Sequence, residues 1–270
     1  MAVIRGKEFR WGSRTYIMGI INLSPDSFSG DGTADLTAAL NTARQMVKDG
    51  ADIIDVGGES TRPGSSPISV EEELNRIIPF VSRAGRWVDV PICVDTYKPD
   101  VAVKALAAGA HMLNDVSGAT RTAEMVNLAG EKGVPIVLMS NQRERPAQNI
   151  VQAVMDDLSR LSDMALMTGL PPEYIIIDPG IGFGKTQEQN LELIRRLDEL
   201  TALKYPILLG VSRKSFIGAV LDMPVERRLE GTAAAVAIGI SKGADIVRVH
   251  DVRVISRVCK MCDAIVRAKG

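Results

Sequence analysis

Histidine and cysteine are scarce in this chain, and each scarcity narrows the kind of protein it can be. The 270 residues include two histidines and three cysteines. Two histidines argue against a structural zinc site and against a histidine-rich metal triad. Three cysteines fit a cytoplasmic protein, where disulfides are rare.

The cysteine spacing is also poor in metal or redox signals. Cys259 and Cys262 form a C-x-x-C pattern inside an expected helix over 252–268, with no second cysteine pair and no histidine beside it. Three residues apart on a helix, they are interpreted as small apolar groups that pack one helix face. Cys93 lies in an expected strand and is interpreted in the same way.

An excess of charge and a long apolar run are missing as well. The formal net charge is −1, which gives no reason to expect a nucleic-acid or membrane partner. The first apolar run, 16–21, is far too short for a signal peptide or a membrane span. No segment rich in serine, proline or glycine is long enough to be a linker. We therefore expect a cytoplasmic protein with one domain over 1–270.

Eight short apolar runs recur along the chain, and nearly every one ends in polar or charged residues. The runs are 16–21, 53–56, 91–94, 112–113, 135–139, 175–177, 206–211 and 246–247. Helix-like segments follow them at 35–48, 69–84, 100–108, 123–131, 149–167, 187–200, 225–241 and 252–268. This alternation predicts an α/β fold, a (β/α)8 TIM barrel with its catalytic groups at the C-terminal ends of the strands.

Two connections on the predicted catalytic face are unusually long. Residues 22–34 follow the first strand and 57–68 follow the second, and both are rich in glycine and proline. Solvated turns are one interpretation. We favour mobile lids over the site, because Asp26, Phe28 and Arg62 give these loops charged and aromatic content.

The glycine-rich segment 179–186 superficially resembles a nucleotide-binding loop. A Walker A motif would require glycine where Pro179 stands, and the glycine spacing does not give G-x-G-x-x-G. We expect the glycines to turn the chain tightly, so that Phe183 lies over the barrel mouth.

Arg248 and His250 follow the last strand and, two residues apart, face the same way in an extended segment. With Asn22 from the neighbouring first strand they predict an anion pocket, in the region where this fold commonly binds phosphate. The alternative is a surface arginine and histidine. His111 precedes a strand at the opposite end and is expected to be packed or solvated.

Two acids and an amide end three other strands. Asp95, Asn114 and Asp178 should project into the mouth beside Lys214, where buried carboxylates need partners. Together they could hold a ring that bears several N–H donors. An alternative, in which an aspartate and the lysine only pair with each other, explains one acid and leaves the others unexplained.

Several motifs, in order along the chain, resemble those of the dihydropteroate synthase family. They are Met18–Ser29, Asp55–Gly64, Val94–Lys98, Leu113–Asp115, Asp178–Lys185 and Ser212–Gly218, and the resemblance extends to Arg248 and His250. It implies condensation of 6-hydroxymethyl-7,8-dihydropterin pyrophosphate with p-aminobenzoate and release of pyrophosphate. A sulfonamide, which mimics aminobenzoate, should then compete with aminobenzoate and not with the pterin.

The resemblance also implies a role for each matched residue. The pterin would be bound by Asp95, Asn114, Asp178 and Lys214 and lined by Met139 and Phe183. The pyrophosphate would be held by Arg248, which also covers the pterin, with His250 and Asn22. The aminobenzoate site would be shaped by Thr61, Arg62, Pro63 and Ser215. A magnesium ion near Asn22 and a homodimer are implied too, and the apolar segment 233–240 suits a buried helix or an interface.

The chain departs from the family pattern at two places. It has Gly30-Asp31-Gly32 where Asp-Gly-Gly is common, which puts Asp31 out of place by one position. It also has Ser140 where many members have histidine, so the polarity of the pocket can differ.

The expected mechanism is dissociative. The pterin expels pyrophosphate and leaves a carbocation, which the aminobenzoate amine captures; the expected catalytic residues are Asp95, Asp178, Lys214, Arg248 and His250. Two alternatives remain: a methyltetrahydrofolate–corrinoid methyltransferase of the same fold, and a catalytically silent pterin-binding paralogue.

Overall fold

Eight parallel strands form a nearly closed barrel in the order β8-β7-β6-β5-β4-β3-β10-β9. The computed structural model describes residues 1–23, 32–60, 66–118, 122–143 and 147–267, and of 32–35 only the backbone. The strands are β3 (Tyr16–Asn22), β4 (Ile53–Gly57), β5 (Ile92–Asp95), β6 (Met112–Asp115), β7 (Ile136–Met139), β8 (Ile175–Asp178), β9 (Leu208–Leu209) and β10 (Ile246–Val249). A parallel bridge from Ile177 to Ile207 links β8 to the start of β9. The predicted TIM-barrel fold is confirmed.

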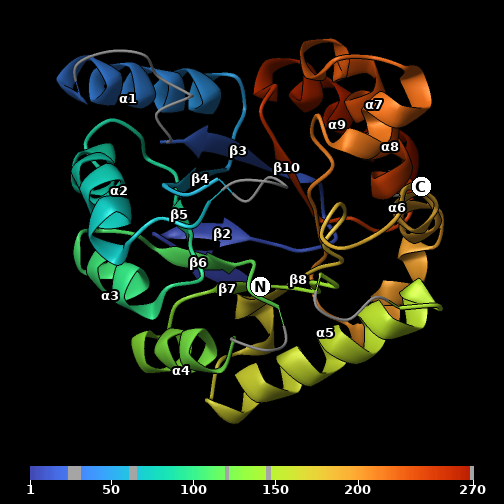
Figure 1. Cartoon of the computed structure of the whole chain (residues 1–270), viewed down its shortest axis with the longest axis horizontal. Helices are drawn as coiled ribbons and strands as arrows, with labels where there is room; N and C mark the ends of the chain where they lie inside the picture. Colours follow the sequence, from blue (N-terminus) through green and yellow to red (C-terminus); the bar gives the residue numbers. More distant parts are fainter. Residues whose placement is uncertain (24–31, 61–65, 119–121, 144–146, 268–270) are drawn as a thin grey trace.

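Helices surround this barrel on its outside (Figure 1). They are α1 (Gly32–Lys48), α2 (Val70–Ala84), α3 (Pro99–Ala107), α4 (Thr122–Lys132), α5 (Ile150–Met167), α6 (Gln187–Arg195), α7 (Ser215–Leu221), α8 (Leu229–Ser241) and α9 (Val252–Val266). Short 3-10 turns are Pro172–Tyr174, Leu197–Leu203 and Val225–Arg227. Helix α7 was not predicted. The predicted helix 225–241 begins as one of these turns, and the predicted strand 206–211 contains only the two residues of β9.

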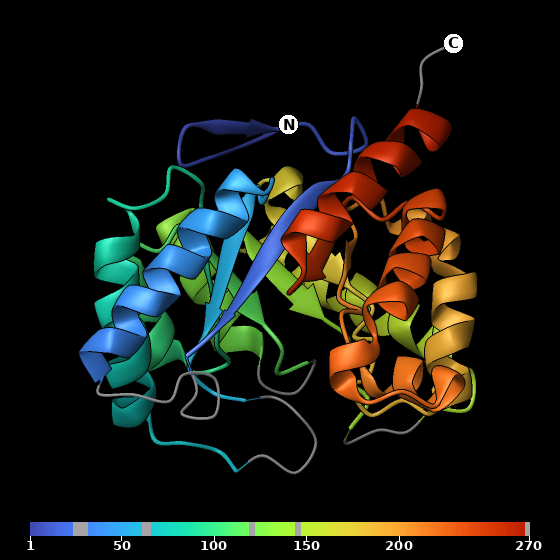
Figure 2. The ribbon, with the colours of Figure 1, turned by 90° about the horizontal axis from the view of Figure 1, so that it is seen from above.

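An antiparallel hairpin, β1 (Ala2–Ile4) and β2 (Lys7–Phe9), precedes the barrel and was also not predicted. Figure 2 shows it across the end of the barrel opposite the predicted catalytic loops. Arg5 and Gly6 both have positive φ, as a tight two-residue turn requires. Ala2, Ile4 and Phe9 are buried. The hairpin therefore forms an apolar floor, built from strands too short to stand out in a mixed N-terminal sequence.

The barrel interior has an apolar layer directly above this floor. Its inward side chains include Tyr16, Met18, Ile53, Cys93, Met112, Val137, Ile176, Leu208 and Ile246, and they form one cluster with the hairpin. A second cluster lies between the strands and the outer helices, where Ile54, Val94 and Val247 pack against helix residues such as Phe80. Because strand side chains alternate between faces, the next inward positions along each strand lie at the opposite end, the mouth.

The cysteines are free, as expected. Cys93 and Cys259 are buried and Cys262 is partly buried, the last two on α9. This confirms the packing interpretation. Among the described residues, every helix is too short or too polar to cross a membrane.

Candidate active site

A buried ion-pair cluster occupies the mouth of the barrel. Arg248 lies on β10 and reaches past β3 to the two strands beyond it. Its Nε donates to Asp55 Oδ2 and its Nη2 to Asp95 Oδ2, each at 2.6 Å. The Asn114 amide also donates to Asp55 Oδ2, at 3.4 Å. Residues of four strands, β4, β5, β6 and β10, are thus joined by polar contacts inside one hollow.

Asp55 was not among the predicted site residues. It is fully buried, and the sequence did carry a signal for it. An acid within the apolar run 53–56 is a charge in an otherwise buried strand, and such a charge needs a partner. The partner is Arg248, 193 residues further along the chain.

One guanidinium serves two carboxylates, so the cluster is one positive charge short. Burial raises the pKa of Asp95 to about 7; Arg248 opposes this rise and Asp55 adds to it. Burial alone would lower the pKa of Arg248, but the two carboxylates reverse the effect and raise it. Asp95 can therefore gain or lose a proton near neutral pH while Arg248 stays charged.

Asp178 and Lys214 lie on the other side of the mouth. Asp178 ends β8, and its Oδ1 accepts from the Gly180 amide at 2.7 Å. Burial raises its pKa, against the influence of Lys214. The Lys214 Nζ donates to the Ile181 carbonyl at 2.5 Å, and burial lowers the pKa of this lysine to about 8. Each residue has a backbone partner of its own, so mutual neutralisation is not their whole role.

The segment 179–186 makes the tight turn that its glycines predict. Gly180, Gly182 and Gly184 all have positive φ. A Cβ on Gly180 would lie 2.0 Å from the Ser140 carbonyl oxygen, so a side chain cannot be accommodated there. The half-buried Phe183 ring has two cationic neighbours, Arg143 with its Cζ 4.8 Å and Lys214 with its Nζ 4.9 Å from the ring centroid. Phe183 therefore presents a flat apolar surface beside charged groups.

Lys185 holds this turn together and was not predicted as a site residue. Its Nζ donates to the carbonyls of Ser140 and Gly180, both at 2.9 Å, and to that of Phe183 at 3.2 Å. Burial lowers its pKa to about 7. No side-chain pattern in the sequence predicts these contacts, because all three acceptors are backbone oxygens.

The predicted anion residues reach the same end of the barrel as the ion-pair cluster. Asn22 ends β3 in register with Gly57, and His250 directly follows β10. The His250 Nδ1 lies 3.0 Å from the Ser212 hydroxyl, which also accepts from the His250 amide at 3.2 Å. The hydroxyl thus orients the ring. Arg248, in contrast, is already paired with Asp55 and Asp95. This pairing was not predicted from the sequence.

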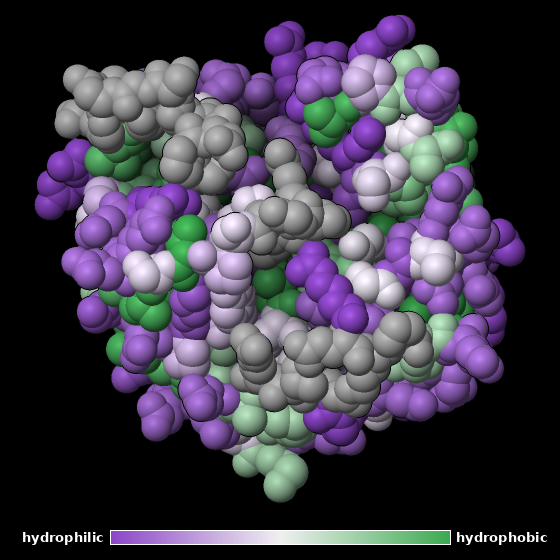
Figure 3. Space-filling model, in the orientation of Figure 1, coloured by the Kyte–Doolittle hydropathy of each residue, from purple (hydrophilic) through white to green (hydrophobic). Residues whose placement is uncertain are grey.

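The remaining predicted residues divide into two groups. Met139 is buried at the end of β7, and Ser215 is exposed at the first position of α7, directly after Lys214. Thr61, Arg62 and Pro63 lie outside the described residues, as do Asp26, Phe28, Asp31 and parts of both long loops. Figure 3 shows that the face with these strand ends is hollowed near its centre, with hydrophilic side chains beside the hollow.

Comparisons with known proteins bear directly on this site. A family model described as "Pterin binding enzyme" matches residues 18–250. Dihydropteroate synthases of Clostridium beijerinckii and Bacillus subtilis are each 49% identical, over 98% and 95% of this chain and 99% and 90% of their own lengths. The chain belongs to the dihydropteroate synthase family. The resemblance stated from the motifs is thereby confirmed.

Solved structures of dihydropteroate synthases agree with this membership in fold as well. The enzyme of Clostridium difficile, solved in the presence of pteroic acid, has a TM-score of 0.93 at 48% identity, covering 97% of this chain and 100% of that one. The Xanthomonas albilineans enzyme in complex with 7,8-dihydropteroate has a TM-score of 0.87 at 35% identity, covering 96% of each chain. Both are similar to this chain over nearly its whole length.

The donor set of this dihydropteroate synthase family member limits the kind of metal site it can build. Among the described residues, no group of three or more histidine, cysteine, aspartate or glutamate side chains could hold a metal ion. Asn22 offers one amide oxygen at the mouth. Magnesium commonly keeps several waters and takes only one or two protein ligands beside substrate phosphates, so a single asparagine fits that pattern.

Proposed function

We propose that this chain joins 6-hydroxymethyl-7,8-dihydropterin pyrophosphate to p-aminobenzoate, forming 7,8-dihydropteroate and releasing pyrophosphate. The observation that carries the proposal is the polar layer of the mouth, in which Asp55, Asp95, Asn114, Asp178 and Arg248 project inward from five strands. A pterin ring bears several N–H donors on one edge, and buried carboxylate and amide oxygens are the acceptors that such an edge requires.

The pterin is held in the mouth by acceptors on two sides. Asp178 accepts N–H bonds with Oδ2, since its Oδ1 already accepts from Gly180. Asp95 and Asn114 act from the opposite strands. Lys214 donates to the ring, and Phe183 and Met139 supply apolar contact. Asp55 keeps Arg248 extended across the mouth, where the planar guanidinium can cover one face of the ring.

The pyrophosphate lies toward Arg248, His250 and Asn22. These three side chains lie at the ends of adjacent strands, where they can stabilise the negative charge of the pyrophosphate as it leaves. Magnesium, held by the Asn22 oxygen, would add positive charge to the departing group. The protein residues orient that group and exclude water from the reacting carbon.

The reaction itself requires charge stabilisation more than proton transfer. The bond between the exocyclic methylene and the pyrophosphate oxygen breaks, and both electrons leave with the oxygen. The carboxylates of Asp95 and Asp178 stabilise the resulting cation from the ring side. The aminobenzoate nitrogen, which is uncharged at pH 7, donates its lone pair to the methylene and releases one proton to solvent. No general base is required.

We also propose a cytoplasmic homodimer that binds no nucleic acid or membrane. Large apolar side chains are exposed on neighbouring helices: Val220 and Leu221 on α7 and Ile238 on α8. Figure 3 shows hydrophobic side chains over this part of the molecule. Exposed apolar groups gathered on adjacent helices suit an interface between copies. Sedimentation at micromolar concentration measures the assembly state directly.

The test of the activity is pyrophosphate release. Wild-type protein, mixed with both substrates and magnesium, should release pyrophosphate in step with the loss of aminobenzoate, and omission of aminobenzoate should suppress product formation. A corrinoid methyltransferase would instead transfer a methyl group from methyltetrahydrofolate. A silent paralogue would bind the pterin and release nothing. Absence of pyrophosphate with intact pterin binding would contradict the proposal.

A further inference from the structure

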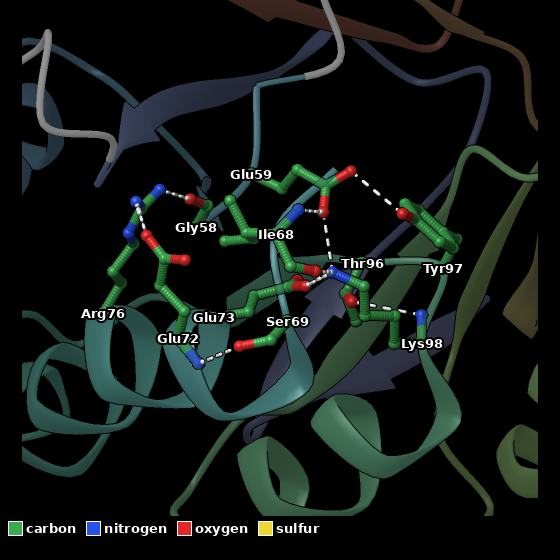
Figure 4. A network of polar contacts seen from close by, with 10 residues as sticks. All are labelled: Gly58, Glu59, Ile68, Ser69, Glu72, Glu73, Arg76, Thr96, Tyr97 and Lys98. Carbon is green, nitrogen blue, oxygen red and sulfur yellow. Dashed lines mark hydrogen bonds and ion pairs between the residues drawn. The ribbon is translucent and has the colours of Figure 1, made fainter. Parts of the chain in front are cut away.

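A second buried polar network lies beside the mouth, at the foot of the β4–α2 connection (Figure 4). It joins three elements: Glu59 follows β4, Glu73 lies in the first turn of α2, and Tyr97 and Lys98 follow β5. None of these four residues belongs to the predicted pterin or pyrophosphate set. The network therefore needs a separate explanation.

The network binds together the two ends of one chain segment, residues 60–67. Before the segment stands Glu59, whose Oε2 accepts from the Ile68 amide at 3.1 Å, directly after the segment. Lys98 Nζ donates to the same Glu59 Oε2 at 2.6 Å and to the Ile68 carbonyl at 2.8 Å. The Glu59 carboxylate and the Lys98 ammonium thus hold the two residues that flank the segment, Glu59 and Ile68, next to each other.

Further contacts fix this clamp, defined as Glu59, Ile68 and Lys98, to the barrel. Lys98 Nζ also donates to Glu73 Oε2 at 2.6 Å, and the Tyr97 hydroxyl donates to Glu59 Oε1 at 2.9 Å. The exposed fractions of the side chains are 13% for Lys98, 10% for Glu59 and 1% for Glu73. Charges this well buried form a defined geometry, because leaving one of them unpaired is costly.

Backbone contacts on the β4 side add to the same arrangement. Arg76 of α2 donates to the Gly58 carbonyl at 2.7 Å. A Cβ on Gly58 would lie 3.1 Å from both Glu73 Cγ and Ile77 Cγ1, so α2 packs tightly against the strand exit. The path of the chain is therefore fixed at Gly58, Glu59 and Ile68, on both sides of the segment.

We infer that Glu59 and Lys98 are positioning residues, which set where segment 60–67 leaves and rejoins the barrel and thereby set the affinity for aminobenzoate. The inference rests on the proposed function and on the family resemblance, which implies that Thr61, Arg62 and Pro63 of this segment shape the aminobenzoate site. It predicts a selective defect: the pterin contacts come from strand ends that the clamp does not include.

The sharpest variant is Glu59→Gln, which keeps the size of the side chain but removes its charge and replaces one acceptor by a donor. We expect KM for aminobenzoate to rise roughly tenfold or more, the effect of losing one charge-assisted hydrogen bond. KM for the pterin pyrophosphate should stay within about twofold of wild type. Tyr97→Phe, which removes only the bond to Oε1, should shift KM for aminobenzoate in the same direction by a smaller factor.

Glu71→Gln is the matched control. Glu71 lies in the first turn of α2, two residues before Glu73, and is exposed. This variant should leave both KM values unchanged. Lys98→Met leaves Glu59 and Glu73 facing each other and is expected to fold poorly; Tyr97→Phe keeps the inference testable if Glu59→Gln is also unstable.

The possible outcomes separate this inference from the proposed function. A wild-type protein that releases no pyrophosphate contradicts the function. An active wild type with a Glu59→Gln variant of unchanged KM for aminobenzoate overturns the clamp alone. Equal rises of both KM values overturn it as well, because they would mean that Glu59 and Lys98 support the whole mouth rather than the aminobenzoate side. A rise confined to aminobenzoate supports it.

Discussion

The two ends of the barrel interior are built from the same strands but hold opposite kinds of side chains. At the hairpin end the inward residues include Ile53, Cys93, Met112, Ile176 and Ile246. Two positions further along the same strands, at the mouth, stand Asp55, Asp95, Asn114, Asp178 and Arg248. Residues two apart on a strand face the same side. The apolar layer that stabilises the barrel and the polar layer that binds ligands are therefore only two residues apart along each strand.

The apolar layer explains why the charged side chains of the mouth are shielded from water. The apolar layer, closed by the hairpin, excludes water from one side of the polar layer. That burial raises the pKa of Asp95 to about 7 and lowers that of Lys214 to about 8. The buried carboxylates of the mouth therefore have fewer cationic and N–H partners than they need within the protein. A ligand with complementary donors can supply the missing partners.

Arg248→Ala should produce the largest effect, because it leaves Asp55 and Asp95 facing each other without a cation. Breaking a buried pair of this kind costs about 3–5 kcal/mol of unfolding free energy. Pyrophosphate binding should also be lost, with a smaller loss for a pterin that lacks pyrophosphate. Urea denaturation and calorimetric titration measure the two effects.

Arg213→Ala provides a comparison for that variant. Arg213 makes a two-point ion pair with Asp251 outside the polar layer, at 2.9 and 2.6 Å, and its side chain is 34% exposed. Its removal should cost roughly 1 kcal/mol or less. Equal losses of stability for the two arginine variants would show that the mouth is not electrostatically distinct.

The change of pterin affinity with pH should be intermediate in size. Asp95 accepts N–H bonds more strongly when it is ionised, so protonation below its pKa of about 7 should weaken the binding of 6-hydroxymethylpterin. Affinity should rise from pH 6 to 7.5, by up to about tenfold per pH unit below the pKa. Asp95→Asn should bind more weakly and lose this slope. A flat wild-type profile between these pH values would show that Asp95 does not titrate in the free site.

The smallest effect is expected in the apolar layer. Ile176→Val removes one methylene from a fully buried side chain two residues before Asp178. It should lower the unfolding free energy by about 0.5–1.5 kcal/mol and leave both KM values unchanged. If KM for the pterin rose while stability stayed at the wild-type level, the separation between the two layers would be wrong.

Much of the architecture could be predicted because most strands are recognisable in the sequence as short apolar runs with a polar residue at the end. Short apolar runs that end in Asp95, Asn114, Asp178 and Arg248 gave both the barrel and the residues of its mouth. The hairpin could not be found, since three-residue strands carry too little periodicity. Asp55 could have been found from an acid inside an apolar run.

Other contacts depend on geometry that a linear sequence does not encode. Arg248 meets Asp55 and Asp95 only because the barrel curves back on itself, with β3 between them. Lys185 binds three backbone carbonyls, and Lys98 binds both a carbonyl and two carboxylates from separate elements. In the sequence, neither lysine can be distinguished from a surface lysine, because only the fold brings its partners close to it.

The most direct test of the polar layer as the pterin site is the titration of Asp178→Asn with 6-hydroxymethylpterin and, separately, with pyrophosphate. Asparagine is nearly isosteric but neutral, and it can place a donor where the ring also donates. The variant should lose roughly 1.5–3 kcal/mol or more of pterin binding free energy and bind free pyrophosphate as the wild type does. Wild-type affinity for the pterin in this variant would contradict the assignment of the mouth.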